Sequence, residues 1–185
     1  RCERLLELER LQARVDRSRF TTIALWDGSV DWAAQGASSG AGWMAPRCGI
    51  SRATARHRVK VARWLRDAPT LVGEALETAR LTCSKVAIFA RVIDNDVRNA
   101  AFEADAHWLV ARAAELRVED VARFLEHWAA FADPESAADD EDARQDKRAV
   151  YLAETFGGVG DLQGPLTPEC LLLAKTLLDL SLIHI

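Results

Sequence analysis

The segment from Ala45 to Val59 reads APRCGISRATARHRV and decides the fold expected for this chain. Its first residue is small, Gly49 follows four positions on, and an apolar residue and then Ser51 come next. This spacing is typical of a helix-turn-helix unit, because Gly accepts the backbone conformation of a tight turn and Ser caps the helix that follows it. We therefore predict two helices joined by a turn over residues 48–51.

The second of these helices, predicted over residues 52–66, has two different faces. Small aliphatic residues recur at i, i+4 and i+7 and can face the core: Ala55, Val59 and Ala62. Basic residues recur at i, i+4, i+8 and i+11 and form a stripe on another face: Arg52, Arg56, Lys60 and Arg63. Such a stripe can neutralise phosphates, and a helix that carries it can enter a DNA major groove. Together with Arg47, these four residues are the candidate DNA-binding residues.

The charge of this region differs from that of the whole chain. The chain has a net charge of −4, whereas residues 47–66 contain seven basic residues and no acidic one. A local basic patch on an acidic chain indicates a polyanionic partner. The competing interpretation is a plain core helix with a solvated arginine face, since the arginines could pair with acidic neighbours.

Pro46 departs from the helix-turn-helix pattern. Inside a helix, proline removes a hydrogen bond and clashes with the preceding turn. It is tolerable here only if the first helix starts near Trp43, so either that helix is very short or the motif is imperfect.

The rest of the chain is predicted to be mainly helical. Apolar residues at helical spacing predict further helices over residues 1–26, 71–79, 84–93, 97–116 and 118–131. Asp27-Gly28 is the expected stop of the first helix, because Gly tolerates the left-handed conformation. Near the C-terminus, strand-like residues 149–153, a Gly-rich turn and residues 161–164 predict a small β-hairpin. Thr167-Pro168-Glu169 then predicts the start of a last helix.

The fold class is therefore mainly α, a multi-helix domain with a helix-turn-helix-like unit and a small hairpin. We divide the chain into an N-terminal amphipathic helix and loop (1–34), a helical core (35–132), an acidic linker (133–147), a hairpin plus helix (148–179) and a tail (180–185). The tail LSLIHI reverse-translates as CTG TCT CTT ATA CAC ATC, which looks like a transposon end used in sequencing libraries. We expect residues 180–185 to be non-native, and a native apolar helix end is the alternative.

Composition favours a cytoplasmic protein that does not enter a membrane. No stretch approaches the roughly 20 apolar residues of a membrane span, and the charged, helix-periodic N-terminus is unlike a secretory signal. The four cysteines are far apart and form no CxxC pair, so a disulfide framework is not expected.

No catalytic or metal-binding residues are predicted in this chain. The histidines His57, His107 and His127 stand alone, without an HxxxH, HExxH or Cys/His pattern. The Gly157-Gly158-Val159-Gly160 segment has no following Lys-Ser/Thr, so it is better interpreted as a hairpin turn than as a phosphate loop. The six tryptophans are spread over predicted helices and are expected in the core rather than on a base-stacking platform.

Three stretches resemble the domain-of-unknown-function family 222, also described as the thirteen-E-twelve repeat family. They are Cys48–Ser51 with Ala55 and Val61–Leu65; Pro69–Thr82 with Lys85-Val86; and Leu152–Glu169, whose Gly-rich hairpin and Leu-x-Pro-Glu-like helix start are the most specific. The family is found mostly in high-GC bacteria, typically ahead of an HNH nuclease, and the scarcity of lysine here agrees with GC-rich coding.

The resemblance implies a predominantly helical domain of nucleic-acid-processing proteins and supplies no catalytic residues for this region. The divalent metal of such a nuclease would belong to the missing module, so no cofactor is expected here. The leading hypothesis is a non-catalytic domain that binds or positions DNA. The alternatives are a sequence-specific regulator-like DNA binder and a helical interaction domain that self-associates through its N-terminal helix.

Overall fold

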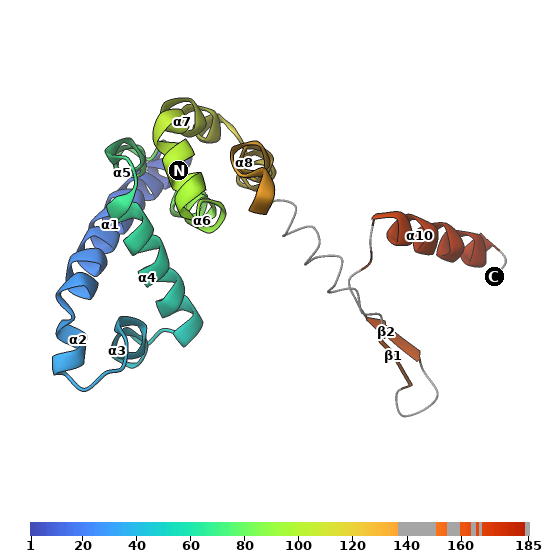
Figure 1. The fold of residues 1–185 in the computed structure, drawn as a ribbon, viewed down its shortest axis with the longest axis horizontal. Helices are drawn as coiled ribbons and strands as arrows, with labels where there is room; N and C mark the ends of the chain where they lie inside the picture. Colours follow the sequence, from blue (N-terminus) through green and yellow to red (C-terminus); the bar gives the residue numbers. More distant parts are fainter. Residues whose placement is uncertain (137–150, 155–159, 164–165, 167, 184–185) are drawn as a thin grey trace. The chain divides into compact units, whose positions relative to one another are not determined.

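The computed structural model describes residues 1–136, 151–154, 160–163, 166 and 168–183. The chain divides into two compact units, Arg1–Asp133 and Pro134–Ile185 (Figure 1). The helices of the first unit are α1 (Cys2–Ser29), α2 (Asp31–Ala34), α3 (Gly40–Arg47), α4 (Arg52–Asp67), α5 (Thr70–Glu77), α6 (Cys83–Val92), α7 (Asp96–Glu115) and α8 (Val118–Ala132). The prediction of a mainly α fold is thus confirmed.

The first unit is built around α4, which packs against α1, α3 and α6. Figure 1 shows α2 and α3 at one end of the α1–α4 pair and α6 to α8 at the other. The predicted inward face of α4 is confirmed, because Ala55, Val59 and Ala62 are all buried. Burying such apolar surface is the main favourable term in folding, and small residues on this face let the neighbouring helices approach closely.

A cluster of aromatic side chains connects α4 to the helices in the second half of the first unit. The Trp64 ring lies 6.2 Å from that of Phe89 and 5.9 Å from that of Phe102, and Phe102 meets Trp128 edge-on at 6.3 Å. These tilted and edge-on contacts are the favoured aromatic geometries. The expectation that tryptophans belong to the core is confirmed for these positions, whereas Trp108 is exposed.

The helix α1 ends later than the sequence predicts. It runs to Ser29, and the left-handed residue after it is Val30, with φ 59°, so Gly28 is inside the helix. The physical reason is tertiary packing: Asp27 is buried and contacts α4, which requires helix geometry through that position.

Pro46 is accommodated in a different way from the one predicted. The helix α3 begins at Gly40 rather than near Trp43, and Pro46 lies in its last turn. The hydrogen bond that Pro46 lacks would have ended on the carbonyl of Gly42, in the first turn of this short helix, so only one bond is lost. The start of the same helix is capped by Ser39, whose Oγ accepts the N–H of Gly42 at 3.1 Å.

Asp133, predicted as the first residue of a solvated acidic linker, is buried at the end of the first unit. Its Oδ2 accepts from Nδ2 of Asn95 at 2.7 Å and lies 3.4 Å from Nε of Arg98. The prediction is wrong for this residue, because two polar side chains near the start of α7 hold its carboxylate. Most of the predicted linker, from residue 137, lies outside the described residues.

The second unit contains two strands and a helix. β1 (Tyr151–Glu154) and β2 (Gly160–Gln163) pair antiparallel, with Tyr151 opposite Gln163 and Glu154 opposite Gly160. They lie where the sequence predicts hairpin strands, and most of the predicted Gly-rich turn is outside the described residues. The helix α10 (Pro168–Ile183) begins at the predicted proline. In the part of the chain that the structure describes, no helix is long and apolar enough to cross a bilayer.

Candidate nucleic-acid interface

The turn before α4 is held by three local features, of which the sequence predicts two, the glycine in the turn and the serine cap. Gly49 has a positive φ of 63°, which a residue with a Cβ adopts at a cost. The N–H of Ile50 donates to the carbonyl of Ala45 at 3.0 Å. Ser51 Oγ accepts the N–H of Thr54 at 3.0 Å, so the predicted N-cap is confirmed. These bonds fix the direction in which α4 leaves the turn and therefore where its first basic residues lie.

Arg52 and Arg56 line a hollow of about 230 Å³ beside the start of α3. Its other lining residues are Ser38, Ser39, Ala41 and Gly42. The hollow thus combines two guanidinium groups, two hydroxyl side chains and the N-terminal end of a helix, where the helix dipole places partial positive charge. No acidic residue is among those that line it. Chemically, this is an environment that favours an oxyanion such as a phosphate.

Sequence reasoning missed Ser38 and Ser39 as site residues, because they were interpreted only as part of a small-residue loop. The signal was present, since Ser39 directly precedes a helix and serine is a preferred N-cap. What the sequence could not show is that this cap lies next to the first turn of α4.

Lys60 is exposed on the same helix but has a different environment. It lines a second hollow, of about 540 Å³, which it shares with Arg63 and with acidic residues of α4, of the α6–α7 connection and of α7: Asp67, Asp94, Asp96 and Glu103. Within the described residues, Arg52, Arg56 and Lys60 form no ion pair with a carboxylate. The field at Lys60 is nevertheless offset by these acids, so a bound anion is favoured most strongly at Arg52 and Arg56.

Arg63 is engaged within the protein. Its Nε donates to Oδ2 of Asp27 at 2.6 Å and its Nη2 to Oδ1 at 3.2 Å. The Asp27 side chain is only 5% exposed, whereas that of Arg63 is 56% exposed. The hydrogen bonding of Arg63 to the Asp27 carboxylate raises the pKa of the guanidinium above its ordinary value. This bidentate pair connects α1 to α4 and removes Arg63 from the predicted row of available cations.

Gly40 adds a packing requirement to this ion pair. A Cβ at Gly40 would lie 2.6 Å from Oδ1 of Asp27 and 3.3 Å from the Trp26 ring. The absence of a side chain therefore lets α3 approach α1 at the point where the carboxylate is held. The start of α3 therefore lies directly against the carboxylate of the Asp27–Arg63 pair.

Arg66 and Arg47 also make contacts within the protein. Arg66 forms a bidentate, exposed pair with Asp67, at 2.7 and 2.8 Å, and the hydrogen bond from Arg66 lowers the pKa of the Asp67 carboxyl. The guanidinium of Arg47 lies 4.7 Å from the centre of the Trp43 ring. A cation–π contact leaves the N–H edges of Arg47 accessible to a ligand, so Arg47 stays a candidate.

No metal centre emerges from the described ranges, in which no three His, Cys, Asp or Glu side chains gather closely enough to hold an ion. The isolated histidines His57, His107 and His127 are all exposed. The structure brings none of them to the hollow that Arg52 and Arg56 line.

The fold and this site define a mainly helical domain whose central helix exposes unneutralised basic residues at its N-terminal half. The family described as Domain of unknown function (DUF222) matches residues 2–179, and the chain belongs to this family. The resemblance seen in the sequence is therefore confirmed. No curated protein and no solved structure matches the chain.

Proposed function

We propose that the first unit binds duplex DNA through its phosphates, without cutting it, and positions it for a separate nuclease. One observation carries this proposal. Arg52 and Arg56 lie together beside the start of α3, in a hollow that no acidic residue lines. Cations that the protein itself does not neutralise attract an external anion at long range and release counterions when they meet a phosphate backbone.

The arrangement of α3, turn and α4 supports duplex DNA over an isolated anion. α4 extends over Arg52–Asp67, and its basic residues recur along one face while its aliphatic residues are buried. A helix with this two-sided character, entered through a tight turn, can lie in a major groove with its N-terminal residues nearest the DNA. Arg52, Arg56 and Arg47 are the proposed phosphate contacts, with Lys60 contributing less.

For the biological setting we propose a cytoplasmic, bacterial HNH-endonuclease-type protein in which this domain precedes the nuclease. This part of the proposal is supported only by the resemblance noted in the sequence. The divalent metal and the hydrolysis would belong to the nuclease module. A regulator-like protein that reads one sequence through α4 is the related alternative, and strong preference for one duplex over random DNA would favour it.

The test is a fluorescence-anisotropy titration of a random duplex with the wild-type chain and with R52A/R56A, over a series of salt concentrations. The double variant should bind about tenfold more weakly at low salt. Its plot of log K against log [salt] should be flatter by about 2, because two phosphate contacts are lost.

The matched control is R112A/R123A, which removes the same charge from arginines that are exposed and locally paired on α7 and α8. Its affinity and salt slope should stay close to wild type. Equal losses in both double variants would mean that only total charge matters, and unchanged binding of R52A/R56A would remove the proposal.

A second candidate function is self-association through α1. Its N-terminal half exposes apolar side chains along the stripe that the sequence predicts: Leu5, Leu8, Leu11 and Val15. In a monomeric protein, a row of this kind leaves apolar surface in water, and such patches commonly mark protein interfaces. A second copy of α1 would cover the stripe by pairing of matching faces.

Analytical ultracentrifugation tests this candidate. A concentration-dependent mass that L5E/L8E abolishes would support it, with V97E as control, because Val97 is an exposed apolar residue on α7. Monomeric behaviour of the wild type at all concentrations would exclude it.

A further inference from the structure

A small cavity lies where α1, α4 and the start of α5 meet, away from the basic hollow. Its volume is about 200 Å³. Apolar side chains form most of its wall: Phe20, Ala24 and Leu25 from α1, and Ala62 and Leu65 from α4. For comparison, an engineered apolar cavity of roughly 150 Å³ holds benzene. The space is therefore sufficient for a ring-sized apolar group.

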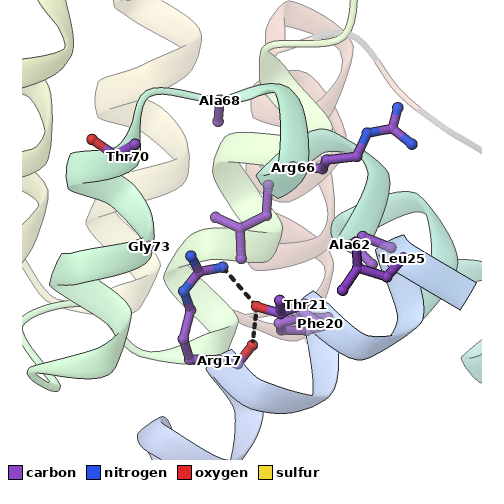
Figure 2. Close-up of a pocket in the computed structure, with 11 residues that line it drawn as sticks. Arg17, Phe20, Thr21, Leu25, Ala62, Arg66, Ala68, Thr70 and Gly73 are labelled. Atoms are coloured by element: carbon purple, nitrogen blue, oxygen red, sulfur yellow. Dashed lines mark hydrogen bonds between the residues drawn. The ribbon is translucent and has the colours of Figure 1, made fainter. Parts of the chain in front are cut away.

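A guanidinium group is positioned at this apolar cavity. Figure 2 shows the head of Arg17 between Thr21 and Gly73, whereas the Arg66 guanidinium points away from it. Nη1 of Arg17 donates to Oγ1 of Thr21 at 3.0 Å. Within the described residues, no carboxylate pairs with Arg17. The group keeps its full charge and several unused N–H donors.

Gly73 makes this position available. A Cβ at Gly73 would lie 2.8 Å from Cζ and Nη2 of Arg17 and 2.9 Å from its Nε. Glycine inside a helix costs roughly 1 kcal/mol relative to alanine. The guanidinium of Arg17, from α1, fills the space that a Gly73 side chain would take in α5.

We propose that this cavity binds a small organic monocarboxylate with a ring-sized apolar body. The carboxylate would accept from the free N–H groups of Arg17 in the bidentate geometry that guanidinium favours. The apolar body would lie against Phe20, Ala24 and Leu65, where it leaves water. This site is separate from Arg52 and Arg56, so it stands independently of the proposed DNA binding.

Benzoate is the probe, and benzamide is its neutral counterpart of nearly equal shape. Both are titrated into the ¹⁵N-labelled full chain, and amide shifts are followed by NMR. Benzoate should shift the amides of Thr21, Leu65 and Gly73 and should bind at least about tenfold more tightly than benzamide, because its hydrogen bonds are charge-assisted.

Two methionine variants separate ligand binding from a purely structural role of Arg17. R17M keeps a long apolar chain but should lose the preference for benzoate, so that both probes bind equally weakly. R66M, at the rim, should keep benzoate affinity within about twofold, since Arg66 is already paired with Asp67. R17K should retain part of the preference, which guards against R17M failing to fold.

The proposal is overturned if benzoate shifts no amides at this cavity. It is equally overturned if benzoate and benzamide bind the wild type with the same affinity, or if a folded R17M still prefers benzoate.

Discussion

The two halves of α4 each carry two arginines about one helical turn apart but use them differently. In the N-terminal half, Arg52 and Arg56 line a hollow without acidic residues. In the C-terminal half, Arg63 and Arg66 each donate two hydrogen bonds to a carboxylate. Within the described part of the chain, the periodic stripe therefore contains unpaired arginines in its first half and an arginine held by a carboxylate of the same chain in its second half. The comparison teaches that counting the arginines on a helix face overestimates the positive charge available to a partner, because some of them are paired within the chain.

The largest expected effect comes from removing Arg63, the arginine that pairs with the buried Asp27. R63A leaves the buried carboxylate of Asp27 without its partner, and we expect it to lower the free energy of unfolding by about 2–3 kcal/mol. The estimate lies below the cost of breaking a fully buried pair because Arg63 is half-exposed. Urea denaturation measures it. R56A, in the other half, should stay within about 0.5 kcal/mol of wild type. Similar losses for both variants would abolish the distinction.

The next effect concerns the close approach that supports the Asp27–Arg63 pair. G40A should destabilise the first unit by about 1–2 kcal/mol, because its Cβ would press on Asp27 and Trp26. G28A is the matched control, since the nearest atom to its Cβ is 3.9 Å away and Gly28 lies inside α1. Alanine there should stabilise by about 0.5–1 kcal/mol. Thermal unfolding should show opposite signs, and a stabilising G40A would contradict the packing argument.

A smaller effect is expected when Arg63 is released from its carboxylate, so that it becomes unpaired, as Arg52 and Arg56 are among the described residues. D27N removes the charge that holds Arg63 and should raise DNA affinity about twofold at low salt, with a salt slope steeper by at most about 1. D31N makes the same charge change at an exposed residue of α2 and serves as control. If D31N raises the affinity as much as D27N, release of Arg63 is not the cause.

The smallest effect is a pH dependence at the exposed pair. The hydrogen bond from Arg66 lowers the pKa of Asp67 in the folded chain below its ordinary value of 3.8. The pair therefore stabilises the fold fully above that value, and its contribution is lost as the pH falls through the lowered pKa. Because both groups are exposed, the contribution is under about 0.5 kcal/mol. Urea titrations of wild type and D67N should differ slightly at pH 6 and converge near pH 2; a difference that grows on acidification would reverse the sign.

Local patterns predict much of the fold. The turn at Gly49, the Ser51 cap and the buried triad of Ala55, Val59 and Ala62 all depend on residues close in sequence, and each is confirmed. The helix boundaries follow the same local periodicity. Where the prediction failed, at the end of α1 and at Asp133, contacts from distant residues outweigh the local preference.

The candidate site was only partly predictable for the same reason. Helical spacing places the basic residues on one face, but the partner of Arg63 is Asp27, 36 residues away. No local pattern indicates that contact, nor the approach of Ser38 and Ser39 to Arg52. The Arg17–Gly73 contact is likewise not predictable from the sequence. A glycine within a helix does not indicate which distant side chain packs against it.

The Trp26–Trp43 pair, with Arg47 stacked on the second ring, has a practical consequence. The two indole rings are 4.8 Å apart, at the same end of the first unit as the serine-lined hollow. If Arg47 leaves its ring to meet a phosphate, as the proposed function requires, the emission of Trp43 should change as the cation departs. Tryptophan fluorescence would then report the proposed binding without any dye attached to either macromolecule.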